Sequence, residues 1–167
     1  LLDGAREEPP VRILYSPTTR RHTSWPRIER DKSLEAVAGW YRALQELHVP
    51  ARAIDEGAIL DGHLTAATRL LIVPQATYLP RALHRLLLDF VREGGTLLIT
   101  PDSGQFDEHG HRRDALLGRA GVAPAPVAEP LVDLGAGRRL RPTAYLEKAS
   151  ALEVLFPGRT ETVAAYA

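Results

Sequence analysis

The sequence contains no cysteine among its 167 residues. Disulfide bonds, thiolate metal sites and a cysteine nucleophile are therefore excluded. Methionine is absent as well, and because a primary translation product begins with methionine, we expect the chain to be a piece of a longer protein. No apolar run approaches the roughly 20 residues of a membrane-spanning helix, and no signal peptide is recognisable. We therefore expect no membrane partner and a cytoplasmic location.

An excess of charge of one sign is also missing. Lys and Arg together number 21, and Asp and Glu together number 21, so the net charge is zero. Nucleic acids and anionic membranes select proteins with a basic excess, which argues against both as the main partner. A neutral chain meets little electrostatic resistance to self-association. The length and the 44% hydrophobic content fit one globular domain with an ordinary core.

The sequence does contain a regular alternation of strand-like and helical segments. Short β-prone or apolar runs that are typical of buried strands occupy residues 11–15, 49–54, 69–73 and 96–100. A helix is predicted over residues 33–48, and another begins near Pro80 and ends at Gly94. This alternation predicts an α/β fold, a flavodoxin-like three-layer sandwich with a mostly parallel central sheet.

Each predicted helix has an apolar face. The first face consists of residues at three- and four-residue steps, namely Leu34, Val37, Trp40, Tyr41, Leu44 and Leu47. The second face consists of Leu83, Leu86, Leu87, Phe90 and Val91. His84 is expected on the flank of this second helix.

Three segments make up the expected domain organisation. Residues 1–10 are charged, end in two prolines, and are predicted to be a linker or the tail of a preceding domain. Residues 11–126 form the α/β domain. Residues 127–167 are expected to be a truncated C-terminal part of the same domain. Elements expected after the fourth strand are a short helix at 114–119 and strands at 131–134, 152–156 and 162–166.

Two long polar loops follow the first and fourth predicted strands, at residues 16–30 and 100–113. Ligands of open α/β sheets bind beyond the carboxyl ends of the strands, where both loops begin. The first loop supplies Arg20, Arg21, Trp25 and Arg27, and the second supplies Asp102, Asp107 and Glu108. We expect the opposite charges to tie the loops together, within a subunit or across an interface that the tryptophan and the arginines anchor.

Several runs of the sequence together resemble the β-galactosidase trimerisation domain, which follows the catalytic barrel in glycoside hydrolase family 42. These runs are Trp40-Tyr41-Arg42-Ala43-Leu44, Val49-Pro50, Leu71-Ile72-Val73-Pro74, Phe90–Thr100, Gly104, Asp107–Arg113 and Leu116–Val122. The resemblance covers about residues 11–122. It implies a fold similar to class I glutamine amidotransferases and a non-catalytic accessory role in oligomer assembly. It also implies a homotrimer, with a covalently linked catalytic barrel that carries the glycosidase carboxylates.

No catalytic centre, metal site or cofactor site is expected in this chain. An amidotransferase needs a cysteine nucleophile, and the Gly-x-Ser-x-Gly elbow of serine hydrolases is missing too. Ser103 with His109 or His111 is the weak alternative, whereas Asp102 and Ser103 more often satisfy backbone groups in a turn. Two histidines on a loop without a third ligand do not indicate a metal. A glycosidase barrel needs roughly 250 residues, more than the chain has.

The alternative function is a binding module, in which a degenerate amidotransferase-like cleft holds a carbohydrate or another small ligand. It predicts a pocket at the strand ends lined by Tyr15, Thr18, Asp102 and Gln105. A third hypothesis, an independent hydrolase, depends on Ser103 or the acidic loop. The candidate ligand or interface residues are Tyr15, Thr18, Arg20, Arg21, Trp25, Asp102, Ser103, Gln105, Asp107 and Glu108.

Overall fold

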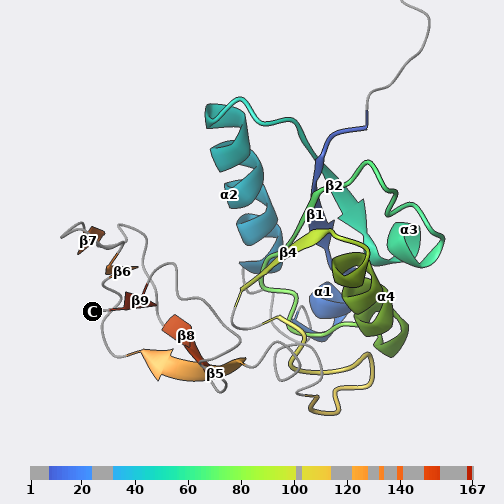
Figure 1. Cartoon of the computed structure of the whole chain (residues 1–167). Coiled ribbons are helices and arrows are strands. Elements are labelled where there is room, and N and C mark those ends of the chain that lie inside the picture. Colours follow the sequence, from blue (N-terminus) through green and yellow to red (C-terminus); the bar gives the residue numbers. More distant parts are fainter. Residues whose placement is uncertain are drawn as a thin grey trace, which may run out of the picture. The chain divides into compact units, whose positions relative to one another are not determined.

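The computed structural model describes residues 8–23, 32–100 and 103–113, and short strands between residues 122 and 166. The chain divides into two compact units, Leu1–Arg113 and Asp114–Ala167. This division lies before the boundary expected at residue 126, and the expected extent of the α/β domain stays a prediction. The first unit, coloured blue to yellow in Figure 1, holds the sheet and helices that form the candidate site.

The first unit is built on a four-stranded parallel sheet. Its elements are β1 (Val11–Tyr15), α1 (Pro17–Thr23), α2 (Lys32–Glu46), β2 (Ala51–Asp55), α3 (Glu56–Leu60), β3 (Leu70–Val73), α4 (Arg81–Arg92) and β4 (Thr96–Ile99). The strands lie in the order β2-β1-β3-β4, and each neighbouring pair is parallel. This order is that of flavodoxin-like sheets. The predicted α/β fold with its parallel sheet is confirmed.

Helices cover both faces of this sheet. Successive residues of a strand point to opposite faces, so Val11 and Ile13 of β1 share one face. These two side chains pack with Val37 and Leu44 of α2. On the other face α4 contacts β4 and α3, and Figure 1 shows α2 and α4 on opposite sides of the sheet. The result is the three-layer sandwich that the alternation of elements predicted.

The helix α4 begins and ends where its sequence signals predict. Pro80 precedes the helix, and its carbonyl accepts the N–H of Leu83 at 3.0 Å. Gly94 follows the helix with φ +94°, a conformation that residues with a side chain rarely adopt. A Cβ atom on Gly95 would lie 2.3 Å from Cζ of Phe90, so the second glycine allows the phenylalanine ring to close over the start of β4.

Two short helices replace connections that the sequence reading treated as loop. α1 begins at once after β1, because Ser16 caps it: the Ser16 hydroxyl accepts the N–H of Thr19 at 2.9 Å, and Pro17 occupies the first helical position. α3 begins in the same way, since the Asp55 carboxylate accepts the N–H of Ala58 at 2.8 Å. The expectation of a loop directly after the first strand was therefore wrong.

The apolar face expected for α2 is too wide. At 100° per residue its six positions spread over about 140° of the helix surface, and only the middle of that arc meets the sheet. Val37 and Leu44 are buried, whereas Leu34, Tyr41 and Leu47 are 47%, 41% and 71% exposed.

The flanks of α4 also differ from expectation. Leu86 and Val91 are exposed, and His84 is buried at 5% exposure although it was placed on the flank. His84 lies on the side that faces the loop of residues 103–113, whose Asp107 carboxylate bonds Arg81 one turn earlier. A contact with a loop from a distant part of the chain therefore decides which flank of α4 is buried.

The second unit, described by itself, contains short antiparallel strands. β5 (Val122–Val127) pairs with β8 (Ala149–Val154), and β6 (Val132–Asp133) pairs with β7 (Arg139–Leu140) and with β9 (Ala165–Tyr166). The strands expected at 131–134, 152–156 and 162–166 overlap β6, β8 and β9. β5 and β7 were not expected, and the two prolines within β5 obscured it. The helix expected at 114–119 lies outside the described residues.

Candidate functional site

The sheet has a topological switch point between β1 and β3, beyond whose carboxyl ends ligands bind in folds with this strand order. Three segments of the chain meet there: the start of α1, the connection after β3, and the loop of residues 103–113. Oγ of Ser16 lies 3.1 Å from the carbonyl oxygen of Tyr78. The N–H of Gly104 donates to the carbonyl of Ala76 at 2.8 Å, and that of Phe106 donates to Thr77 at 3.0 Å.

Hydroxyl groups and one carboxylate lie together beyond the carboxyl end of β1. The Thr19 hydroxyl donates to the carbonyl of Tyr78 at 2.8 Å and accepts the N–H of the same residue at 3.0 Å. The carboxylate of Glu56 accepts the Thr18 hydroxyl at 2.6 Å and also accepts the Ser16 hydroxyl. All four side chains are at most 4% exposed. The polar atoms of these side chains therefore bond to groups of the chain itself.

Ser103 is a buried structural group at the end of β4. Its side chain is 0% exposed. Its hydroxyl donates to the carbonyl of Val73 at 2.8 Å and accepts the N–H of Ala76 at 3.1 Å. The imidazoles of His109 and His111, the two proposed bases, are 67% and 69% exposed. The two backbone contacts confirm the turn-stabilising role expected of Ser103. Because the side chain is fully buried, a substrate has no access to its oxygen. Asp102 lies outside the described residues.

Asp107 organises the second polar loop. Its Oδ2 accepts two hydrogen bonds from Arg81 of α4, from Nε at 3.0 Å and from Nη2 at 2.8 Å. Its Oδ1 accepts the backbone N–H groups of His109 at 3.0 Å and His111 at 2.9 Å. Burial by itself would raise the pKa of Asp107. The N–H of His111 and the Arg81 guanidinium outweigh that effect, so the pKa lies well below its ordinary value.

The expected pairing between the charges of the two polar loops is therefore wrong for Asp107. Its cationic partners are Arg81 and, at 3.6 Å, Arg113. Arg20 donates to the Tyr15 hydroxyl and Arg21 to the Thr18 hydroxyl, both at 3.1 Å.

The two polar segments nevertheless meet, as expected, through other residues. Nε2 of His22 lies 2.9 Å from the carbonyl oxygen of Glu108. The His22 ring stacks on Tyr78 with centroids 4.3 Å apart, and Tyr78 stacks on Phe106 at 5.0 Å. The sequence reading missed these aromatic contacts, as well as Glu56 and Arg81. No sequence motif indicates that these residues contact one another, so their roles become visible only in the folded chain.

The other described candidate residues also lie in this region. Tyr15 and Gln105 are half-buried, and Arg20 and Arg21 are exposed. Glu108 accepts the N–H of Arg81 at 2.8 Å, and hydrogen bonds from its own N–H and from that of Arg81 lower its pKa.

Trp25 lies outside the described residues. Two further findings concern the described part of the chain. It contains no cluster of three or more His, Cys, Asp or Glu residues able to hold a metal. No helix within it has the length and apolarity to cross a membrane.

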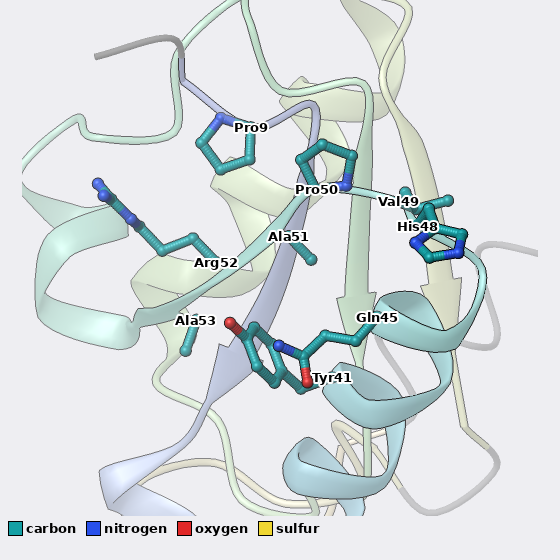
Figure 2. Close-up of a pocket in the computed structure, with 9 residues that line it drawn as sticks. All are labelled: Pro9, Tyr41, Gln45, His48, Val49, Pro50, Ala51, Arg52 and Ala53. Carbon is teal, nitrogen blue, oxygen red and sulfur yellow. The ribbon is translucent and has the colours of Figure 1, made fainter.

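An open groove of about 720 Å³ lies at the opposite, amino end of the sheet. Its walls come from the end of α2 and from the edge strand β2, and Figure 2 shows Tyr41 and Gln45 reaching over that strand. The lining residues are Pro9, Tyr41, Gln45, His48, Val49, Pro50, Ala51, Arg52 and Ala53. None of the residues expected to line a strand-end pocket belongs to this groove.

Several of the solved structures that resemble the chain are β-galactosidases. A β-galactosidase from the haloarchaeon Halorubrum lacusprofundi has a TM-score of 0.69 and 17% identity over 95% of this chain and 24% of its own. A catalytic mutant of Gan42B, a GH42 β-galactosidase from G. stearothermophilus, has a TM-score of 0.68 and 21% identity over 89% and 22%. A β-galactosidase from Bifidobacterium adolescentis has a TM-score of 0.51 and 22% identity over 62% and 45%.

These identities support a shared fold, and the chain spans less than half the length of each of these proteins. No curated protein matches the chain. Residues 11–123 match the family model described as the beta-galactosidase trimerisation domain. Because the match includes more than half of the chain and agrees with the resemblance seen in the sequence, the chain belongs to the beta-galactosidase trimerisation domain family.

Proposed function

We propose that this chain is a non-catalytic domain that assembles a glycoside hydrolase of the β-galactosidase type into a trimer. A catalytic barrel in the same polypeptide would carry the reaction, and residues 1–10 would connect to it. The observation that carries the proposal is the filled switch point between β1 and β3. There Ser16, Thr19 and Ser103 are at most 2% exposed and are bonded within the chain.

The filled switch point disfavours the alternative of a carbohydrate-binding module. A sugar entering this region would separate Ser16 and Thr18 from Glu56 and would leave a buried carboxylate without its hydroxyl partners. Each buried polar group that loses its partner costs about 1–3 kcal/mol. The hydroxyls of a sugar ring would have to replace these bonds with the same geometry in a space that is already occupied.

The neutral charge of the chain also favours assembly. With 21 basic and 21 acidic residues, two copies have no net repulsion to overcome. A cytoplasmic location and the extent of the domain over residues 11–126, with 127–167 as its C-terminal part, stay predictions of the sequence.

The proposal is tested by measuring light scattering of the purified chain over a concentration series, in parallel with galactose and lactose titrations and hydrolysis of a chromogenic β-galactoside. We expect a defined oligomer, no saturable sugar binding and no turnover. A strict monomer that binds galactose would reverse the assignment in favour of the binding module. Turnover that disappears in Ser103→Ala would instead support the hydrolase.

A further inference from the structure

A second stripe of side chains lies on the flank of α2, beside its buried face. It consists of four exposed residues at alternating four- and three-residue steps, Leu34, Ala38, Tyr41 and Gln45, and the exposed His48 follows two residues after the end of the helix. Leu34 is 47% and Tyr41 is 41% exposed, and both are among the few large apolar side chains on the described surface. Isolated apolar residues are normal on a protein surface, but a helical stripe that leads into a groove is typical of a contact surface.

The stripe continues directly into the groove beside β2. Tyr41, Gln45 and His48 form one wall of the groove, and Ala51 and Ala53 lie along the strand (Figure 2). Among the described strands β2 pairs with β1 alone, so it is an edge of the sheet. Ala51 and Ala53 are small and leave the backbone of this edge accessible to another chain, and the exposed Arg52 between them adds a positive charge. The stripe and the edge therefore form one continuous surface.

We propose that the α2 stripe and the edge of β2 form the surface through which one copy of this chain contacts another. This inference rests on the proposed assembly function and assigns it a place on the domain. Arg52 is the charged residue that lines the groove, and α2 adds Lys32, Glu35, Arg42 and Glu46, which makes three basic and two acidic residues. A surface of nearly balanced charge suits a copy of the same neutral chain, whereas a nucleic acid or a strongly acidic partner would select one sign.

The length of α2 is comparable to the dimension of a standard interface. An interface of standard size buries about 800 Å² on each partner, an area equal to a square of about 28 Å per side. α2 has 15 residues. At 1.5 Å per residue it is about 22 Å long, and the groove widens the surface beside it. A small-molecule site is a weaker explanation, because such sites enclose most of the ligand and this groove is open along the strand edge.

Two substitutions on the stripe, each with a matched control on α4, test the inference by sedimentation velocity of the full chain. Tyr41→Arg has Leu86→Arg as its control, since Leu86 is an apolar residue 36% exposed on the opposite face. Ala38→Glu has Ala82→Glu as its control, and both alanines are exposed in helices where Glu retains helix propensity. Circular dichroism establishes that each variant is folded.

We expect both stripe variants to weaken self-association at least tenfold and both controls to leave it unchanged. Self-association at the wild-type level in folded Ala38→Glu and Tyr41→Arg would overturn the proposed surface while leaving the assembly function intact. Equal weakening by the α4 controls would also overturn it. A wild-type chain that stays monomeric throughout would overturn the assembly function itself, and the surface with it.

Discussion

Gly95 and Gly39 occupy opposite packing situations, although both belong to the most permissive residue type. The ring of Phe90 occupies the place of a side chain on Gly95, where Cβ would lie 2.3 Å from Cζ. Nothing lies within 4 Å of the Cβ position of Gly39 in α2. Gly95→Ala should therefore destabilise the domain by about 1–3 kcal/mol through overpacking. Gly39→Ala should stabilise it by about 0.5–1 kcal/mol because alanine favours a helix.

Urea denaturation of the two glycine variants checks this prediction. The account requires changes of opposite sign in the free energy of unfolding. No loss of stability in Gly95→Ala would contradict the packing assigned to Phe90, and a loss in Gly39→Ala would contradict the open space beside Gly39.

His84 should make stability depend on pH. It is 5% exposed, and neither ring nitrogen has a hydrogen-bond partner among the described residues. Burial, followed by the charge of Arg113, lowers its pKa, and Glu108 and Asp107 oppose the shift only in part. Because the folded pKa lies below the unfolded value of about 6.5, the contribution of the neutral ring is complete above that pH. It is lost as the pH falls through the lower folded pKa.

The measurement is the thermal midpoint of wild type, His84→Gln and the exposed control His63→Gln from neutral pH to pH 5. We expect His84→Gln to flatten the decline seen in wild type and His63→Gln to retain it. Parallel pH profiles for all three proteins would show that His84 is not the group responsible.

At the scale of elements, one ion pair joins the loop of residues 103–113 to α4. The Asp107 carboxylate accepts hydrogen bonds from the Arg81 guanidinium and from backbone N–H groups of the loop, so Asp107→Asn should open the loop. Hydrogen exchange at the amides of His109 and His111 should become faster in the variant. The control is Asp89→Asn, which breaks an exposed pair with Arg92 and should change stability by at most about 0.5 kcal/mol.

The same pair gives a pH dependence of known sign. The folded pKa of Asp107 lies below the unfolded value of about 3.9, so its stabilising effect is complete above that pH and is lost as the pH falls further. Wild type and Asp107→Asn should therefore differ most near neutral pH and converge in acid. A constant difference down to pH 2 would contradict the charge state assigned to Asp107.

Elements with a long apolar pattern were predictable from the sequence, and elements that depend on a single cap were not. The strands β1, β3 and β4 and the helices α2 and α4 have apolar patterns that reflect packing on a sheet. α1 and α3 are too short for such a pattern, and their signals are Ser16-Pro17 and Asp55. β5 contains two prolines, which the propensity rules assign to turns.

The candidate site was predictable in its place but not in its contacts. The rule for strand ends in open sheets located the two polar segments correctly, and His22 and Tyr78 join them. The acidic residues of the second polar segment, Asp107 among them, were expected to pair with the arginines of the first. The partner of Asp107 is Arg81, because the packing of α4 against the loop brings Nη2 of Arg81 to 2.8 Å from Oδ2 of Asp107. No local sequence pattern indicates that these two residues are neighbours.

At the scale of the whole molecule, the first unit is a flavodoxin-like domain in which buried polar side chains at the switch point are bonded within the chain. Such a domain retains the stability of the fold and presents its outer surfaces to other polypeptides. Membership of the beta-galactosidase trimerisation domain family agrees with a role for these outer surfaces in contacts between polypeptides. The central claim is that the chain assembles and does not bind a ligand at the strand ends.

Sedimentation equilibrium of the 167-residue chain tests that claim most directly. The account predicts that the mass reaches a plateau at three times the 18.3 kDa of one chain as the concentration rises. A mass that stays at 18.3 kDa at the highest concentration would contradict it.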